Sequence, residues 1–220
     1  MATSTVEDYL KAIYLEEQRG SGLVAPGRIA VALGVAPGTV TAMVKALAES
    51  GLVRYEPYSG VAVTPEGRRL ALHVLRRHRL LELFLVEVLG MDWTEVHDEA
   101  ESLEHAVSER LVERIDEMLG FPEADPHGDP IPSAQGEVPK LDHSDLLTCA
   151  VGVPLKVARV RDQSSAFLRL VERHGLMPGS RLEVGRREAA AETVELRLLS
   201  EDRGIHLGFG AAAKIEVEPD

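Results

Sequence analysis

The chain has 220 residues, of which 45% are hydrophobic and 27% are charged, and its formal net charge is −12. This composition is ordinary for a soluble globular protein, and the length suffices for two or three small domains. No run approaches the roughly 18 apolar residues of a transmembrane helix, and the polar N-terminus lacks the apolar region of a secretory signal. Cys149 is the only cysteine, which excludes a disulfide within the chain. We therefore expect a cytoplasmic protein.

The negative charge is concentrated in the middle of the chain. Residues 1–77 carry 9 basic and 7 acidic side chains, residues 78–140 carry 4 and 16, and residues 141–220 carry 11 and 13. A DNA-binding domain joined to an acidic cation-binding domain would show this distribution. A solvated acidic helix surface is the alternative.

The first part of the chain predicts three helices in succession. Apolar residues recur at helical spacing over residues 5–19, where Thr5 can cap the helix, and again over about 26–33 and 37–50. Gly34 separates the second helix from the third. This spacing is typical of a helix-turn-helix.

A hairpin and a longer helix follow. Residues 52–64 show the alternating pattern of a strand pair around a Pro-Tyr-Ser-Gly turn, which predicts a hairpin. Pro65 suits the first position of a helix that reaches about residue 89. The order indicates a winged helix-turn-helix domain over residues 1–70, whose third helix would enter the DNA major groove. The candidate DNA contacts, each of which could instead be an ordinary surface side chain, are Arg28, Thr39, Thr41, Lys45, Arg54 and Tyr58.

Residues 71–140 predict a helical domain for metal binding and dimerisation. Apolar residues at helical spacing over about 93–119 predict a second helical block, and with the helix from Pro65 it offers enough apolar surface for a dimer interface. Residues 120–139 are rich in Pro, Gly and Asp, which predicts an extended linker.

The last part of the chain, residues 144–220, changes to short β patterns. The runs LKVARV, RLEVGR, TVELRLL and AAKIEVE predict strands, and SSAFLRLVERHGL predicts a helix between the first two. Short strands joined by Gly-rich turns favour a small SH3-like β-barrel. The predicted fold class is therefore mainly α with a small β part: a winged helix-turn-helix domain, a helical dimerisation domain and an SH3-like domain.

Two helical patches carry residue types that ligate metals. His78 and Glu82 are four residues apart and therefore share a helix face. Imidazole and carboxylate suit Mn(II), Fe(II), Co(II) and Zn(II), and without a cation the carboxylates of such a patch would repel one another. A polar helix face is the alternative reading. The second patch places four such residues at i, i+4, i+7 and i+8 on one stripe of one helix: His97, Glu101, Glu104 and His105.

Runs along essentially the whole chain carry a family resemblance. They are EDYLKAIY at 7–14, the helix-turn-helix through SGLV at 50–53, VTPEG at 63–67, RRHRLLELFL at 76–85, VHDEAESLEH at 96–105 and GDPIP at 128–132. The sequence resembles the diphtheria-toxin-repressor (DtxR) family of metal-dependent regulators. The resemblance implies a homodimer that binds palindromic operator DNA when loaded with Mn(II) or Fe(II). Such a protein would repress metal homeostasis genes, such as those of metal transporters.

The resemblance also implies two metal sites in each subunit. The second site falls on His78, Glu82 and His97. The iron branch of the family also draws second-site ligands from its C-terminal domain, and the nearest positions in this chain are Asp162 and Gln163. The regulatory site falls on Asp8, Glu101, Glu104 and His105.

Two positions of the regulatory site separate the metal branches of the family. The iron-selective branch has Met in place of Asp8 and Cys in place of Glu101, so both positions here match the manganese branch. Carboxylates in place of thioether and thiolate favour the harder Mn(II). The manganese branch has another acid where this chain has Lys11. Because Asp8 would share its metal with the helical domain, metal binding and DNA binding would be coupled.

Three other classes of protein remain as alternatives. An enzyme is disfavoured because no nucleophile, P-loop or Rossmann fingerprint accompanies the ligands. A winged-helix regulator that senses a small organic molecule would need an apolar cavity and would be indifferent to a chelator. A peptide-binding barrel is disfavoured by the few aromatic residues of the C-terminal part.

Overall fold

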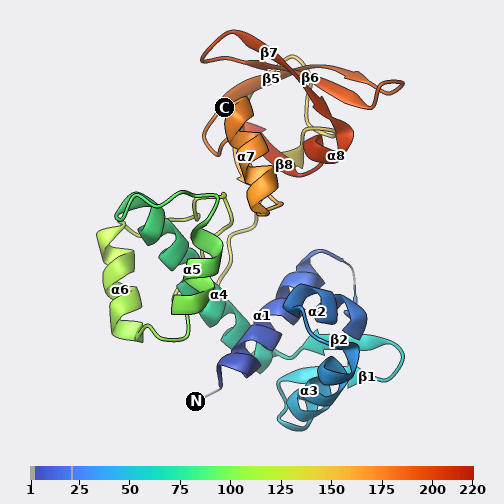
Figure 1. Cartoon of the computed structure of the whole chain (residues 1–220), viewed down its shortest axis with the longest axis vertical. Coiled ribbons are helices and arrows are strands. Elements are labelled where there is room, and N and C mark those ends of the chain that lie inside the picture. The colour runs from blue at the N-terminus through green and yellow to red at the C-terminus, as the bar shows by residue number, and fades with distance from the viewer. Residues whose placement is uncertain (1–2, 21) are drawn as a thin grey trace. The chain divides into compact units, whose positions relative to one another are not determined.

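The computed structural model describes residues 3–20 and 22–220, and the chain divides into two compact units. The first comprises residues 1–78, 104–106 and 132–137, and the second comprises residues 79–103, 107–131 and 138–220. Figure 1 colours the chain along its length and labels the elements. Among the described residues no single helix is long and apolar enough to cross a membrane, although the helices Pro26–Leu33 and Pro37–Glu49, bent by 110° at their junction, pass that test as a pair.

The first unit begins with the three predicted helices: α1 (Ser4–Gln18), α2 (Pro26–Leu33) and α3 (Pro37–Glu49). The predicted cap of α1 is wrong, because Thr3 caps this helix by accepting a hydrogen bond from the backbone of Val6, and Thr5 lies inside it. Gly34 ends α2 in a left-handed conformation with φ of 64°, which lets the chain turn at once into α3.

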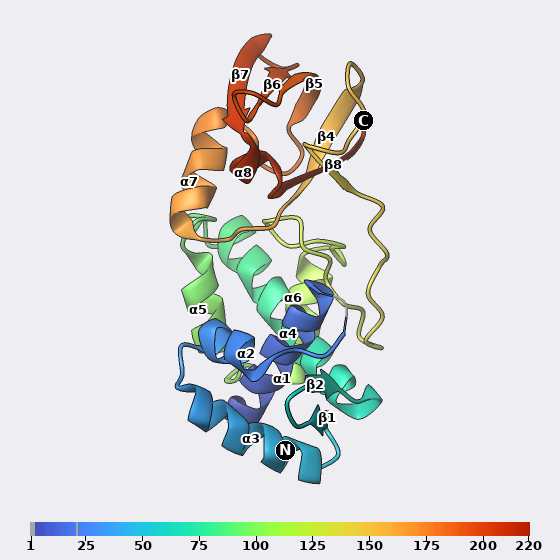
Figure 2. The same ribbon diagram turned by 90° about the vertical axis from the view of Figure 1, so that its right-hand side faces the viewer.

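The predicted hairpin consists of β1 (Val53–Glu56) and β2 (Gly60–Val63), paired antiparallel. It packs on α3, as Figure 2 shows, and the long helix α4 (Pro65–Glu87) follows it. Residues 4–63 therefore form the predicted winged helix-turn-helix. Apolar side chains from all of its helices and from the hairpin form its core: Leu10, Ile13, Ile29, Leu47 and Val61.

The second unit contains the last turns of α4 and two shorter helices, α5 (Val96–Leu103) and α6 (Glu109–Met118). The helical block predicted over 93–119 thus consists of two helices, and the prediction of a single helix through residues 97–105 is wrong. The hydroxyl of Ser108 accepts a hydrogen bond from the backbone of Leu111 and starts a new helix there. Consequently Glu104 and His105 lie in the turn after α5 and share no helix stripe with His97.

Much of the predicted linker is a buried, hydrogen-bonded loop. Oδ1 of Asp125 accepts hydrogen bonds from the backbone N–H groups of His127 and Asp129, at 2.8 and 3.0 Å. All three side chains are buried. The Pro- and Gly-rich composition was misleading because these residues form a tight turn held by an aspartate.

The C-terminal part is a six-stranded antiparallel sheet in the order β3-β8-β4-β5-β6-β7. The helices α7 (Ser165–His174) and α8 (Phe209–Ala212) accompany it, and α7 packs its apolar face on the sheet (Figures 1 and 2). The sequence did not predict β7, because its pattern is interrupted by glycines at both ends. The predicted fold class is confirmed. The strands are β3 (Ser144–Asp145), β4 (Pro154–Val160), β5 (Arg181–Glu188), β6 (Thr193–Leu198), β7 (Arg203–Gly208) and β8 (Ile215–Pro219).

Candidate metal centre and nucleic-acid interface

Asp8, Glu104 and His105 converge although they come from distant parts of the chain. Asp8 lies on α1, and the other two lie in the turn after α5. Nε2 of His105 lies 2.7 Å from Oδ1 of Asp8 and 3.4 Å from Oε1 of Glu104. One ligand atom from each residue lies within 4.8 Å of the others. We call this trio the α1 group.

Neighbouring charges hold the α1 group in place. Nδ1 of His105 lies 2.8 Å from Oε2 of Glu7, which also accepts a hydrogen bond from Arg77 at 2.8 Å. Such contacts behind a ligand fix the orientation of its ring. Oε1 of Glu104 accepts a hydrogen bond from Nζ of Lys11 at 2.6 Å. The other oxygen, Oε2, lies 2.6 Å from Nδ1 of His78. Burial alone would raise the pKa of Glu104, but the hydrogen bonds and charges of His78 and Lys11 outweigh it and lower this pKa.

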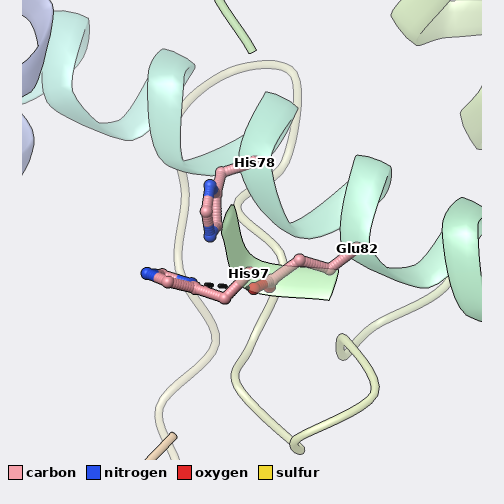
Figure 3. A group of neighbouring side chains, drawn as sticks. All are labelled: His78, Glu82 and His97. Atoms are coloured by element: carbon pink, nitrogen blue, oxygen red, sulfur yellow. Dashed lines mark hydrogen bonds and ion pairs between the residues drawn. The ribbon is translucent and has the colours of Figure 1, made fainter. Parts of the chain in front are cut away.

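A second trio, the α4 group, consists of His78, Glu82 and His97. His78 and Glu82 lie one turn apart on α4, and Nδ1 of His97, from α5, lies 3.1 Å from Oε1 of Glu82 (Figure 3). His78 and Glu82 are buried, whereas the side chain of His97 is 43% exposed. The structure thus brings together the three residues of the predicted second site.

A third trio, the loop group, was not predicted. It consists of Glu82, Asp125 and His127, which are all buried and offer ligand atoms within 4.8 Å of one another. Asp125 and His127 belong to the segment that we interpreted as a linker, so their signal in the sequence was missed. The run Asp-Pro-His-Gly at 125–128 could have revealed it, because Asp, Pro and Gly favour an ordered turn and the turn carries two ligand-type side chains.

The loop group has the electrostatics of a cation site. Burial, together with the charges of Asp129 and Glu82, raises the pKa of Asp125 well above its ordinary value, and Arg79 only partly opposes this. Oδ2 of Asp125 and Nδ1 of His127 are buried and have no hydrogen-bond partner among the described residues. A buried polar atom of this kind is costly, and a bound cation would satisfy both atoms.

All three groups offer only imidazole nitrogens and carboxylate oxygens. Donor sets of this kind suit Mn(II), Fe(II), Co(II) and Zn(II), and they lack the thiolates of a structural zinc site. The residues present therefore fit a divalent cation.

The candidate DNA contacts lie on α2, α3 and the hairpin. Thr39, Lys45 and Tyr58 are exposed, and Tyr58 stands at the hairpin turn with φ of 67°. Thr41 is half-buried, and its hydroxyl donates to the carbonyl of Pro37 at 3.1 Å. Three of the candidates are therefore fully accessible to DNA, while the hydroxyl of Thr41 is already engaged.

The two remaining candidate DNA contacts are arginines that already have acidic partners. Arg28 pairs with Glu16 at 2.6 Å, and Arg54 lies 3.4 Å from Glu56. Both arginines are exposed, so a DNA phosphate would compete with these carboxylates for them.

Family models match almost the whole chain. They are "Iron dependent repressor, N-terminal DNA binding domain" at residues 1–61, "Iron dependent repressor, metal binding and dimerisation domain" at 64–133, and "FeoA domain" at 145–219. The iron-dependent repressor IdeR of Mycobacterium tuberculosis is 35% identical over 193 residues, which are 82% of this chain and 83% of that protein. The chain belongs to the iron-dependent repressor family. The predicted resemblance is therefore confirmed.

A further relative and a solved structure are also similar to this chain. The diphtheria toxin repressor of Corynebacterium glutamicum is 38% identical over 155 residues, which span 69% of this chain and 66% of that protein. A solved structure described as a manganese-dependent transcriptional repressor in complex with manganese is 43% identical, with a TM-score of 0.90, and covers 98% of this chain and 100% of its own. Relatives and structural neighbours are thus metal-dependent transcriptional repressors.

Three predicted ligands of this family member lie outside the trios found among residues 3–20 and 22–220. The carboxylate of Glu101 is 53% exposed and lies 3.8 Å from Nε2 of His97. Asp162 pairs with Lys214 at 2.7 Å, and the amide of Gln163 donates to Asp129 at 2.6 Å. Glu101 fell outside because α5 ends before Glu104, so the expected common stripe does not exist.

Proposed function

We propose that this protein is a transcriptional repressor that binds operator DNA as a homodimer when Mn(II) occupies the α1 group. The observation that carries the proposal is the convergence of Asp8, on the first helix of the winged helix-turn-helix, with Glu104 and His105. A metal there would be shared between the DNA-binding helices and the turn that continues into α6. Metal and DNA would then each strengthen the binding of the other.

The residues of the α1 group would perform this coupling. Asp8, Glu104 and His105 would hold the ion, and Glu7 would keep the ring of His105 oriented through its 2.8 Å contact. The ion would supply the positive charge that lets two carboxylates stay close together. α1 would thereby be held against the turn at residues 104–106, so that α3 is presented to DNA in one orientation.

We infer Mn(II) as the preferred metal, with Fe(II) as the runner-up. The donor sets contain carboxylate and imidazole but no sulfur, and hard ligands of this kind favour Mn(II). The α4 and loop groups would add one further ion, because they share Glu82 and compete for it. Two ions in each subunit is therefore the proposed stoichiometry.

We propose that the helical part forms the homodimer. Apolar side chains that the sequence predicted for an interface, Leu111 and Met118 of α6, are 48% and 68% exposed, and a second copy would cover them. Two copies would present two α3 helices, which suits a palindromic operator. The proposed domains are residues 1–70, 71–140 and 144–220. We also propose a cytoplasmic location, because the proposed partner is operator DNA.

Fluorescence anisotropy with the DNA upstream of the protein's own gene tests this function. Binding would be measured at one fixed salt concentration with chelator, with Mn(II), and with Fe(II) without oxygen, because phosphate contacts make affinity salt-dependent. We expect Mn(II) to tighten binding by a factor of about ten or more, which corresponds to about 1.4 kcal/mol. Equal affinity with chelator would favour a regulator that senses an organic ligand instead.

A further inference from the structure

Lys11 brings a buried positive charge into the α1 group. Its side chain is only 10% exposed, which is unusual for lysine, and its ammonium lies 2.6 Å from Oε1 of Glu104. Lys11 follows Asp8 by three residues on α1 and Glu7 by four, so the three share one face of this helix. The ammonium is therefore held beside the proposed ligands by the fold.

The oxygen that Lys11 contacts is the one that faces the other ligands. Oε1 of Glu104 lies 2.6 Å from Lys11 Nζ and 3.4 Å from Nε2 of His105. The other oxygen, Oε2, lies 2.6 Å from Nδ1 of His78. Both oxygens of this fully buried carboxylate are thus engaged, and a metal ion that uses Oε1 of Glu104 meets the ammonium of Lys11 there.

Charge favours the displacement of Lys11. A divalent ion and an ammonium at the same carboxylate oxygen repel each other strongly in a buried site, whereas His78 contacts the other oxygen, Oε2. The ammonium also stabilises the metal-free protein, because a buried carboxylate without a cationic partner is costly.

We propose that Lys11 is a built-in counter-ion that occupies Glu104 in the metal-free protein and sets the metal concentration at which the repressor responds. The inference rests on the proposed function, because it concerns metal binding at the α1 group. Lys11 supports the site while it is empty and competes with the ion when the ion arrives. Its removal therefore raises affinity for the metal and lowers the stability of the metal-free protein.

The test is Mn(II) binding to the 220-residue chain and to its Lys11→Met variant, measured by titration calorimetry. Methionine keeps the apolar stem of lysine and removes the ammonium, with its charge and its hydrogen bond to Glu104. We expect Lys11→Met to bind Mn(II) at this site about tenfold more tightly, which is the effect of losing one charged competitor. Lys140→Met, which removes an exposed lysine charge, is the matched control and should bind as the wild type does. Lys11→Gln, which keeps a neutral donor, should also bind more tightly and serves if the methionine variant folds poorly.

A second readout needs no metal. Thermal unfolding in chelator should show a lower Tm for Lys11→Met than for the wild type, and the difference should shrink in a Glu104→Gln background, where the carboxylate charge is absent. Unchanged or weaker Mn(II) binding by both Lys11 variants, while the wild type binds Mn(II), would overturn the inference alone. Absence of Mn(II) binding by the wild type would overturn the proposed function together with the inference.

Discussion

Nε2 of His105 lies 2.7 Å from Oδ1 of Asp8, although 97 residues separate the two in the chain. This contact joins the first helix of the DNA-binding part to the turn between α5 and α6. The fold has thus already brought an atom from each of two proposed ligands together before any metal binds. The contact is the structural basis of the proposed coupling between metal and DNA.

The loop group makes the stability of the metal-free protein depend on pH. Because the folded protein raises the pKa of Asp125, the stabilising proton is present below the ordinary carboxyl pKa of 3.8 and is lost as the pH rises through the raised value. In chelator, the stability of the wild type should therefore fall relative to that of Asp125→Asn as the pH rises over this range. Urea unfolding at several pH values measures the difference. A constant difference would contradict the raised pKa.

Loss of a loop-group ligand should change metal stoichiometry. His127 is fully buried, and replacement by alanine removes a nitrogen that no described side chain can replace in that trio. If this trio holds the second ion, His127→Ala should bind one Mn(II) fewer in each subunit, as measured by elemental analysis after equilibrium dialysis. Unchanged stoichiometry would assign the second ion to the α4 group.

Gly128 should be essential for the shape of the loop. A Cβ there would lie 2.0 Å from the carbonyl oxygen of Ala158, and the backbone has φ of 86°. Gly128→Ala should therefore lower the free energy of unfolding by about 2 kcal/mol or more. Gly90→Ala is the control, because Gly90 also has a positive φ, of 66°, but nothing within 4 Å of its added Cβ. Equal losses in the two variants would show that the contact with Ala158 is unimportant.

Lys45 should contribute to DNA affinity without adding sequence preference. It is exposed on α3, where a lysine can reach a phosphate. Lys45→Ala should weaken binding to all duplexes alike and reduce the slope of log affinity against log salt by about 1. Anisotropy at several salt concentrations measures this slope. An unchanged slope would remove Lys45 from the interface.

Cys149 should resist thiol reagents in the folded protein. Burial raises the pKa of its thiol, and the charge of Arg187 only partly opposes this, so little reactive thiolate is present near neutral pH. Reaction with a chromogenic disulfide should be slow in buffer and fast in denaturant. Fast labelling of the native protein would show that the site opens readily.

Local sequence patterns predicted the elements that depend on local forces. The helices of the DNA-binding part and the hairpin were predicted nearly residue by residue, because Pro26, Pro37 and Gly34 mark their ends and their apolar spacing is regular. The break before α6 was not predicted, because the apolar pattern continues through it. The cap at Ser108 nevertheless starts a new helix there. Periodicity alone did not show this.

The candidate site was predictable only in part for the same reason. His78 and Glu82 share a helix turn, so their proximity follows from spacing. The approach of Asp8 to His105 depends on tertiary packing, and it was expected only through the family resemblance. Asp125 and His127 were not predicted, because the composition of their segment is typical of a linker. The segment is instead an ordered turn, in which the carboxylate of Asp125 accepts hydrogen bonds from the backbone of His127 and Asp129.

The most direct test of the central claim is the metal dependence of DNA affinity in Asp8→Ala. Anisotropy would compare Mn(II) with chelator at fixed salt for the wild type, for Asp8→Ala and for Glu99→Ala, an exposed acid on α5 that serves as control. Circular dichroism would establish that all three are folded. We predict that the wild type and the control bind DNA at least about tenfold more tightly with Mn(II), while Asp8→Ala shows no gain. An undiminished gain in Asp8→Ala would contradict the claim that the α1 group couples metal to DNA.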